Sequence, residues 1–539
     1  MGDVFDFVIV GAGSAGCVLA ERLSASGRHS VAVIEAGGSD RRFWVQTPLG
    51  YGKTFYDPSL NWAYRAEPDP GLAGRSDYWP RGKLLGGSSS INAMVWVRGA
   101  AGDFDDWAAE GNPGWSYADC LPFFKSIEDN EAGEDLWRGR GGAQRVSDVS
   151  GRLHPLARRF IEAGRQAGFA FNPDFNGAAQ DGVGVYQINT KNGWRMSAAK
   201  AFLRPAAKRR NVSVLSEAMA TRLLFEGRRA SGVEIRRGAQ TRIIGARREV
   251  IVAAGAVNSP QLLQISGVGP GAHLSGLGVG VLHDSPAIGR HLQDHIGINY
   301  TYRSRVRTLN QALRPWRGKL AAGLDFLIRS RGPLSLSLNQ AGGFVRTRPE
   351  LPRADIQLYF QAISTLGAKS GTRPLLTPDP FPGFSLGLSN CRPTSRGSIL
   401  ARSADPFTAP RIEPNALATS EDVETCLEGV KLLRRLAAQP ALAEVIEDEL
   451  APGPDAQSDA ELIADFRRRA GTVYHPVGTC RMGPNGTSGA VDARLRVFGL
   501  EGLRVADASV FPTIVSGNVN AAVMMVAAKA ASLILQDAR

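Results

Sequence analysis

The sequence DFVIVGAGSAGCVLAERL at residues 6–23 decides the fold. An apolar run of strand length leads directly into a glycine-rich turn, and a helical pattern of apolar residues follows the turn. A second apolar run at 31–34 ends in Glu35. Strand, turn, helix and second strand together form the βαβ unit of a dinucleotide-binding domain. The sequence therefore predicts an α/β protein with a Rossmann-like, doubly wound sheet.

Each glycine of the G-x-G-x-x-G pattern has its own expected role. Gly11 permits the tight turn, Gly13 lets the backbone approach a pyrophosphate, and Gly16 lets helix and strand pack closely. Glu35 lies 19 residues beyond Gly16 and is placed to accept hydrogen bonds from a ribose diol. An acid at this position favours an unphosphorylated ribose, and hence FAD or NAD, and this pattern alone does not separate the two.

Two further glycine-rich segments follow. RGKLLGGSSSIN at 81–92 has glycines and hydroxyls that can wrap a second part of a long cofactor, which an NAD dehydrogenase would not need. GAVNSPQLLQISGVG at 255–269 comes directly after an apolar strand at 250–254. We therefore expect a cofactor domain that is assembled from distant parts of the chain.

Together these segments resemble the glucose-methanol-choline (GMC) oxidoreductases, flavoenzymes that oxidise alcohols. The resemblance extends through five more motifs: NGWR at 192–195, NCRPTSRG at 390–397, HPVGTCRMG at 475–483, RVADAS at 504–509 and SGNVN at 516–520. It implies an FAD-binding domain and an α+β substrate domain with a mostly antiparallel sheet. The implied segments are 1–150, 205–300 and 470–539 for FAD, and 151–204 and 301–469 for the substrate.

The resemblance also implies the residues that contact FAD. They come from the glycine-rich segments, from the end of the second strand and from the C-terminal motifs: Gly11, Gly13, Ser14, Ala15, Gly16, Glu35, Ala36, Arg81, Gly86, Gly87, Ser88, Asn92, Ala93, Met94, Val95, Ala220, Asp507, Ala508, Val519 and Asn520. Some family members attach the flavin covalently through a histidine just before the equivalent of Asn92. Here that residue is Ile91, which has no nucleophilic nitrogen, so we expect noncovalent FAD.

Alcohol oxidation removes the hydroxyl proton and passes the carbinol hydride to the flavin, so the protein has to orient the alcohol and accept the proton. Histidine suits the second task because its unperturbed pKa is about 6.5. Of the seven histidines, only His475 lies in a dense, glycine-flanked motif. The resemblance makes His475 the catalytic base and places its partner, a histidine or asparagine in different branches, at Asn518. We expect Asn518 to hold the substrate oxygen.

The substrate is predicted less directly. Many relatives have a glutamate just before the AGGF stretch, where this chain has Gln340. A cationic substrate such as choline needs a carboxylate and an aromatic cage. Tyr474 offers one aromatic wall, but Gln340 removes a charge, so the sequence favours an uncharged primary alcohol that contacts both residues.

Several alternatives to this reading stay open. They are a choline dehydrogenase or oxidase, an O2-using aryl-alcohol-type oxidase, a flavin photodecarboxylase as a minor alternative, and an NAD-dependent dehydrogenase on the first glycine pattern alone. A noncatalytic binding protein or basic nucleic-acid binder rests on the net charge of +12 alone. The expected electron acceptor is a quinone-like molecule or O2.

Composition and charge disfavour other classes of protein. The chain has 43% hydrophobic and 21% charged residues, which is typical of a globular protein. The net charge is +12, but the arginines are spread along the chain, so we expect no nucleic acid partner. HLQDH at 291–295 resembles a zinc-binding helix but lacks a third ligand at a recognisable spacing, so we expect no metal.

The sequence also bears on location. It has neither the features of a signal peptide nor an apolar stretch of transmembrane length. Its five cysteines are scattered, as suits a reducing compartment. We expect a cytoplasmic enzyme, with peripheral contact at the inner face of the membrane left open.

Overall fold

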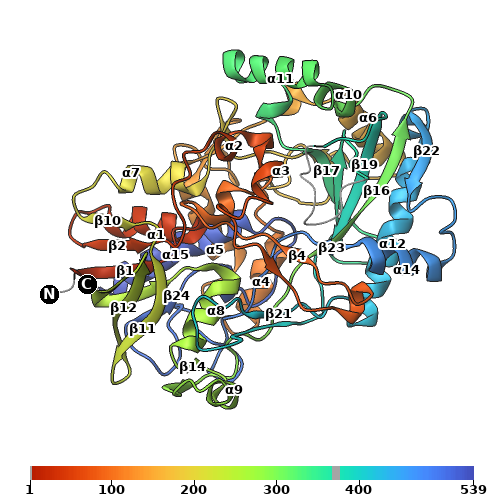
Figure 1. Ribbon diagram of the computed structural model, residues 1–539. Helices are drawn as coiled ribbons and strands as arrows, with labels where there is room; N and C mark the ends of the chain where they lie inside the picture. The colour runs from red at the N-terminus through yellow and green to blue at the C-terminus, as the bar shows by residue number, and fades with distance from the viewer. Residues whose placement is uncertain (1–2, 367–376, 539) are drawn as a thin grey trace.

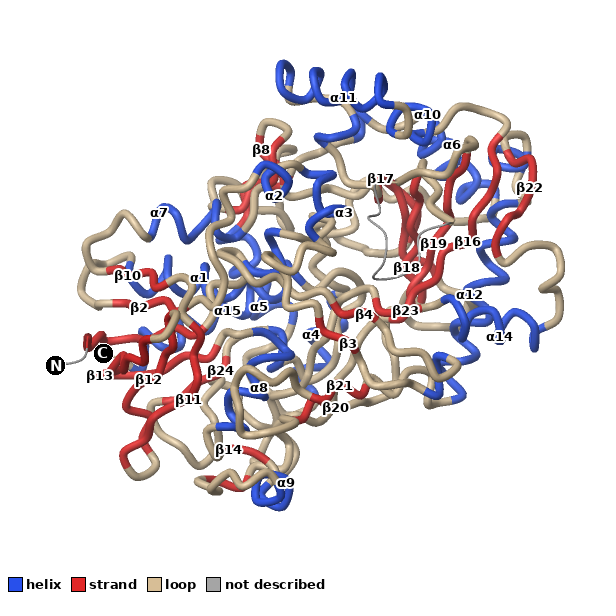
Figure 2. The backbone as a smooth tube through the Cα atoms, viewed as in Figure 1, coloured by secondary structure: helices blue, strands red, loops and turns tan. Residues whose placement is uncertain are grey.

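The computed structural model describes residues 3–366 and 377–538. Two seven-stranded sheets dominate it, and they lie in two lobes (Figure 1; Figure 2). The sheet with the glycine-rich turn is at the lower left of these views, and the second sheet is at the right.

The first sheet combines a parallel part with an antiparallel meander. Its order is β10-β2-β1-β13-β12-β11, with β24 paired to β13. The contacts from β10 to β13 and on to β24 are parallel, and those from β13 to β11 are antiparallel. The strands are β1 (Asp3–Val10), β2 (Val31–Ile34), β10 (Val212–Leu215), β11 (Met219–Glu226), β12 (Arg229–Arg237), β13 (Gln240–Val252) and β24 (Leu503–Val505). All four residues of β2 are buried, as in a sheet covered on both faces.

Helices cover this sheet. Helix α1 packs on α15, and α15 packs on α5. Lys529 is the one charge in the middle of the apolar helix α15, and its ammonium donates to the carbonyl of Gly114 and lies 4.9 Å from the ring centroid of Trp115. The apolar C-terminal run is therefore a core helix. The helices of this lobe are α1 (Ser14–Ser24), α4 (Ala101–Ala109), α5 (Tyr117–Ile127), α7 (Arg204–Ala206), α8 (Gly255–Ile265), α9 (Gly271–Gly276) and α15 (Asn520–Asp537).

The second sheet is antiparallel throughout. Its order is β22-β16-β19-β18-β17-β7, with β23 paired to β16. The strands are β7 (Gly182–Val185), β16 (Ile296–Ser304), β17 (Asn339–Val345), β18 (Ile356–Gln361), β19 (Gly383–Asn390), β22 (Ile446–Ala451) and β23 (Gly471–Thr472). Nearby helices are α2 (Phe43–Gln46), α3 (Tyr51–Thr54), α6 (Pro155–Gln166), α10 (Leu309–Leu313), α11 (Trp316–Arg329), α12 (Ser420–Ala437), α13 (Pro440–Ala443) and α14 (Asp459–Arg469). The predicted α/β fold with a mostly antiparallel second sheet is confirmed.

The remaining strands pair in twos. They are β3 (Tyr64–Arg65) with β4 (Tyr78–Trp79), β5 (Glu128–Asn130) with β6 (Gln144–Val146), β8 (Thr190–Lys191) with β9 (Trp194–Arg195), β14 (Val268–Gly269) with β15 (His283–Asp284), and β20 (Ser398–Leu400) with β21 (Arg411–Glu413). Among the described residues, no helix is long and apolar enough to cross a bilayer.

Two strands of the second sheet begin inside segments that the sequence assigns to the FAD domain. β16 starts at Ile296, and β23 spans 471–472, whereas the predicted substrate segment is 301–469. The reason is that these two strands pair with each other, Ile296 opposite Thr472 and Gly297 opposite Gly471. The chain thus passes between the lobes through a short antiparallel ladder.

Gly16 tests the close contact at the start of α1. A Cβ on Gly16 would lie 1.8 Å from the carbonyl oxygen of Gly11, whereas one on Gly276 in α9 would meet nothing within 4 Å. We expect Gly16→Ala to destabilise the protein by about 1–3 kcal/mol or to prevent folding, because backbone has to move. Gly276→Ala should stay within about 1 kcal/mol of wild type. Thermal unfolding of both variants measures the difference; equal midpoints would contradict it.

Candidate active site

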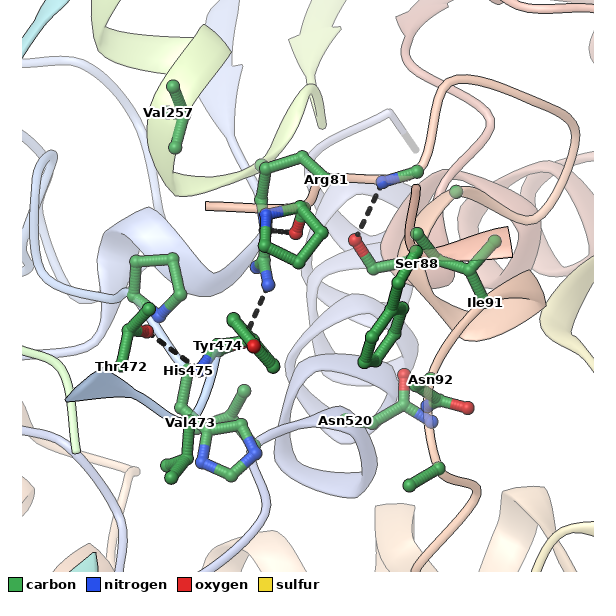
Figure 3. Close-up of a pocket in the computed structure, with 18 of the residues that line it drawn as sticks. Arg81, Ser88, Ile91, Asn92, Val257, Thr472, Val473, Tyr474, His475 and Asn520 are labelled. Atoms are coloured by element: carbon green, nitrogen blue, oxygen red, sulfur yellow. Dashed lines mark hydrogen bonds between the residues drawn. The ribbon is translucent and has the colours of Figure 1, made fainter. Parts of the chain in front are cut away.

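A large cavity lies between the two lobes. Its volume is about 1120 Å³, above the roughly 300–1000 Å³ usual for one ligand, so it has room for a cofactor and a substrate. Residues of the first sheet and its helices line one end, and residues of the second sheet line the other. Figure 3 shows His475, Asn92 and Asn520 around the same space.

The glycine-rich turn forms one wall of this cavity. Gly11 has φ +103°, a left-handed conformation that favours glycine. A Cβ on Gly13 would meet nothing within 4 Å, while one on Gly87 would lie 2.8 Å from the Gly13 Cα. The second glycine-rich segment therefore packs against the first where Gly87 meets Gly13, and the Gly13 backbone still faces the cavity.

The start of α1 fits an anionic group. Its N-cap residue, Gly13, offers no side-chain acceptor, so the first amides of the helix have no capping side chain. The helix dipole and these amides favour a phosphate at this position. Helix α15 also begins at the cavity, with Val519 as an N-cap that makes no side-chain hydrogen bond. Ser14 and Asn520 join the two helix starts through a 2.7 Å hydrogen bond.

Glu35 fits a ribose. It directly follows β2, is buried, and accepts hydrogen bonds from the backbone amides of Ala12 (2.9 Å) and Gly37 (2.8 Å). Each carboxylate oxygen uses one lone pair in this way and keeps another for a hydroxyl donor. Burial raises the pKa of Glu35 to about 7, and the two amide hydrogen bonds oppose the rise.

Asp507, a predicted cofactor contact, also holds parts of the backbone together. Its carboxylate accepts from the backbone amides of Gly255 and Ser509, both at 2.8 Å, and from the Ser259 hydroxyl at 2.5 Å. It therefore holds the start of α8 against the chain that follows β24. Asp507 and Ala508 both line the cavity.

Most of the predicted FAD contacts line the cavity, but Gly16 and Gly86 do not. Gly16 packs on Gly11, as described above. A Cβ on Gly86 would lie 2.3 Å from the Ser90 hydroxyl oxygen, so Gly86 makes room for the turn itself. Both glycines shape the backbone around the cofactor. The residues that do line the cavity are Gly11, Gly13, Ser14, Ala15, Glu35, Ala36, Arg81, Gly87, Ser88, Asn92, Ala93, Met94, Val95, Ala220, Asp507, Ala508, Val519 and Asn520.

His475 and Asn518 meet in the cavity. The Asn518 amide nitrogen lies 3.2 Å from His475 Nε2, and the other ring nitrogen, Nδ1, lies 3.0 Å from His295 Nδ1. The two imidazole rings are perpendicular. The ladder of β16 and β23 brings these histidines together, because His295 directly precedes β16 and its carbonyl accepts from the Val473 amide at 3.0 Å.

The hydrogen bonds fix which nitrogen of each ring carries the proton. His295 Nε2 lies 2.9 Å from the carbonyl oxygen of Cys391, which can only accept, so Nε2 carries the hydrogen of His295. His295 Nδ1 then accepts from His475 Nδ1–H. This leaves the lone pair of His475 on Nε2, the nitrogen that faces Asn518 and the cavity.

The orientation of Asn518 is fixed in the same way. Its carbonyl oxygen accepts from Gln357 Nε2 at 3.2 Å, and the Gln357 carbonyl accepts from the Tyr359 hydroxyl at 2.7 Å. Asn518 therefore directs its NH2 group toward His475 Nε2. A donor and a lone pair, 3.2 Å apart, converge where an alcohol hydroxyl can replace their mutual hydrogen bond.

The surroundings keep His475 uncharged. Burial, followed by the nearby His295 and Arg81, lowers its pKa well below 6.5. Burial likewise lowers the pKa of His295 to about 4. Asp294 anchors the backbone from behind: its carboxylate accepts from the His475 amide at 2.8 Å and from the Thr472 hydroxyl, and burial raises its pKa to about 7.

The two predicted substrate contacts fare differently. Tyr474 lines the cavity, with φ +72° and its ring edge-on to Phe55 at 5.4 Å. Gln340 does not line it, which differs from the prediction. Neighbours in a strand point to opposite faces, so Asn339 faces the cavity while the side-chain oxygen of Gln340, Oε1, accepts from the His154 backbone amide at 2.8 Å.

Sequence reasoning missed His295, Gln357 and Tyr359. It considered His295 only as a zinc ligand, because its spacing from His291 resembles a zinc-binding helix. His295 is instead a buried residue at the start of a strand. Among the described residues, no group of three or more His, Cys, Asp or Glu could hold a metal ion. The sequence contains no signal for the pairing of β16 and β23, which gives His295 its position.

Comparison with known proteins agrees with this geometry. Two family models, both described as GMC oxidoreductase, match residues 5–297 and 393–527, so the chain belongs to the GMC oxidoreductase family. It is 41% identical to an alcohol dehydrogenase (acceptor) of Pseudomonas putida, covering 99% of this chain and 96% of that protein. It is also 41% identical to an oxygen-dependent choline dehydrogenase of Rhizobium etli, covering 98% and 95%.

A solved structure shares the fold along nearly the whole chain. Pyridoxine 4-oxidase from Mesorbium loti superposes with a TM-score of 0.88 at 32% identity, and the match covers 98% of each chain. Family membership confirms the predicted class, an alcohol-oxidising GMC enzyme with FAD as its cofactor. Ile91, buried beside Asn92, offers no nucleophile to the flavin, in keeping with noncovalent FAD.

The low pKa of His475 leads to a prediction about pH. Because His475 stays uncharged well below pH 6.5, we expect kcat/KM to stay on its plateau down to below that pH and to fall only in more acidic solution. His295→Asn removes a group that lowers the His475 pKa, so the acid limb should move to higher pH. His29→Asn, remote from the cavity, is the control. An acid limb that is unchanged in His295→Asn would contradict this role.

Proposed function

We propose that the protein oxidises an uncharged primary alcohol to the aldehyde, with His475 as general base and Asn518 as the group that orients the alcohol. The observation that carries the proposal is the convergence of the His475 Nε2 lone pair and the Asn518 NH2 group in the cavity. The alcohol hydroxyl donates to Nε2 and accepts from Asn518. Bound FAD supplies the acceptor for the carbinol hydride.

The protein residues manage the proton. His475 accepts it at Nε2 while its Nδ1–H stays bonded to His295, whose own Nε2–H is held by the Cys391 carbonyl. The Asn518 amide cannot compete for the proton and keeps its donor on the substrate oxygen. Cys391 itself is buried, so its backbone carbonyl serves the site rather than its thiol. A histidine so placed favours alcohol oxidation over the photodecarboxylase alternative.

The charges of the cavity support a neutral substrate over choline. Among the described lining residues, the acids are Glu35, Asp77 and Asp507, and all three accept hydrogen bonds from backbone amides. The lining includes the arginines Arg65, Arg75, Arg81, Arg468 and Arg469. A quaternary ammonium would face these cations without a dedicated carboxylate.

The shape of the substrate end supports an aliphatic or aromatic chain. The aromatic rings of Tyr51, Phe55 and Tyr474 form one wall. The ring centroid of Phe55 lies 5.5 Å from that of Tyr51 and 5.4 Å from that of Tyr474. Apolar and uncharged polar residues in and next to the strands of the second sheet form the other wall: Ile298, Leu338, Asn339, Gln361, Ile363 and Leu388. Such a surface buries hydrocarbon and leaves an alcohol's single polar group for His475 and Asn518.

We further propose that the enzyme is a dehydrogenase that passes electrons to a quinone-like acceptor, as the name of the P. putida relative suggests. The oxygen-dependent relative keeps O2 as the second candidate. The five buried, unpaired cysteines support a reducing compartment and hence the cytoplasm.

Removal of the base tests the mechanism. We expect His475→Ala to lower kcat by about 10²–10⁴-fold because proton removal in the transition state is lost, while the flavin absorbance of the protein is retained. His283→Gln, at the surface strand β15, is the matched control. The assay is a panel of neutral alcohols and choline, followed with both a quinone-like dye and an oxygen electrode. Full activity of His475→Ala would refute the proposed base.

A designed carboxylate tests the substrate class. Gln361 lines the cavity and its side-chain amide donates to the side-chain oxygen of Asn339, Oδ1, at 2.8 Å, and Gln361→Glu keeps the shape of the side chain. We expect the ratio of kcat/KM for choline to that for a neutral alcohol to rise about 10-fold, as one new ion pair can provide. Gln340→Glu, which points away from the cavity, should leave the ratio unchanged. A wild-type preference for choline would refute the neutral substrate.

A further inference from the structure

Helix α11 presents an apolar stripe to solvent. Five large apolar side chains on it are between 49% and 76% exposed: Trp316, Leu320, Leu324, Leu327 and Ile328. At 3.6 residues per turn they fall within roughly one third of the helix circumference. Contiguous exposed apolar side chains on a folded protein usually mark a contact surface. We call these five residues the α11 stripe.

The fold does not use this stripe for packing. The buried residues of α11 are Ala322 and Phe326, on the other side of the helix. The Phe326 ring lies 4.5 Å from Trp194 and 6.3 Å from Phe43, measured between centroids, and this contact fixes the helix to the protein. α11 lies at the outer edge of the molecule in both views (Figure 1; Figure 2). It is thus held firmly with its apolar side outward.

Cations flank the stripe. Residues 314–331 contain five basic side chains and one acid, Asp325, which gives a net charge of +4. The five are exposed: Arg314, Arg317, Lys319, Arg329 and Arg331. Lys53 is exposed as well, and it lies close enough to Lys319 that the charge of Lys319, after burial, lowers the pKa of Lys53. A partner for this surface has to be apolar at its centre and anionic around it.

We propose that the α11 stripe docks the protein on an anionic phospholipid bilayer. Trp and Leu side chains enter the boundary between headgroups and acyl chains, and the flanking arginines and lysines contact the anionic headgroups. A second copy of the chain fits less well, because a symmetric pair would bring two +4 surfaces together. The proposal stands on the exposure and charge of α11 alone and is independent of the proposed substrate.

Docking at α11 would bring the bilayer close to the substrate end of the cavity. The chain leaves α11 at Arg329 and reaches Leu338, a cavity-lining residue, nine residues later. The Leu338 amide donates to the hydroxyl of Tyr51, another lining residue, at 3.3 Å. The bilayer concentrates apolar alcohols and holds quinones, so this side of the molecule is suited to exchange of substrate and electron acceptor with the bilayer.

Vesicle sedimentation tests the proposal. FAD-loaded wild-type protein should sediment with vesicles that contain 30% phosphatidylglycerol in phosphatidylcholine, and binding should weaken at high salt. We expect Leu320→Glu/Leu327→Glu to weaken partitioning at least 10-fold. Arg317→Gln/Lys319→Gln should weaken it about 30-fold, the equivalent of about 1 kcal/mol for each cation near an anionic surface.

The matched controls make the same kinds of substitution at exposed positions outside α11. Ile243→Glu/Phe407→Glu alters two apolar side chains that are both 53% exposed, and Arg140→Gln/Arg237→Gln removes two exposed arginines. Both controls should bind like wild type, and all variants should keep the wild-type flavin spectrum and unfolding temperature. Equal binding by wild type and both α11 variants would overturn the proposal. The proposal would also be overturned if the wild-type protein did not bind vesicles but formed a concentration-dependent dimer that Leu320→Glu/Leu327→Glu abolished.

Discussion

The site depends on one directional chain of hydrogen bonds that starts at the Cys391 carbonyl. Because a carbonyl can only accept, it sets the proton of His295, which in turn sets the proton of His475 and leaves the His475 lone pair facing the cavity. Two neutral imidazoles are needed for this order, and burial supplies them by lowering both pKa values. The pairing of Ile296 with Thr472 brings the two rings into contact.

The cofactor end follows a second constraint, the close approach of backbone to backbone. Gly16 lies against the Gly11 carbonyl, and Gly87 lies against Gly13, so two glycine-rich segments from different parts of the chain share one small volume. A side chain at Gly16 or Gly87 would force these backbone segments apart. Glu35 is buried at the same place and depends on the amides of Ala12 and Gly37 for its charge.

The sequence was a good guide wherever the backbone itself carries the chemistry. The glycine spacing and Glu35 predicted the first sheet and its cavity wall, and the motif around His475 predicted the residue at the centre of the site. The sequence could not predict the positions of residues that depend on the pairing of strands far apart in the chain. His295 acquires its position from the ladder of β16 and β23, which brings it to His475, 180 residues away. Gln340 does not face the cavity as predicted, because Asn339 takes the inward position of β17. Whether an apolar helix such as α11 is covered is equally invisible in a hydrophobic pattern.

The net charge of +12 also has a clearer meaning in three dimensions. As a total it decided little, since the arginines are scattered along the sequence. In the structure, some of them gather around the cavity, as with Arg65 and Arg468, and others gather around the exposed side of α11. The first group opposes a cationic substrate, and the second favours an anionic surface. The same excess of positive charge therefore bears both on the choice of substrate and on where the enzyme meets it.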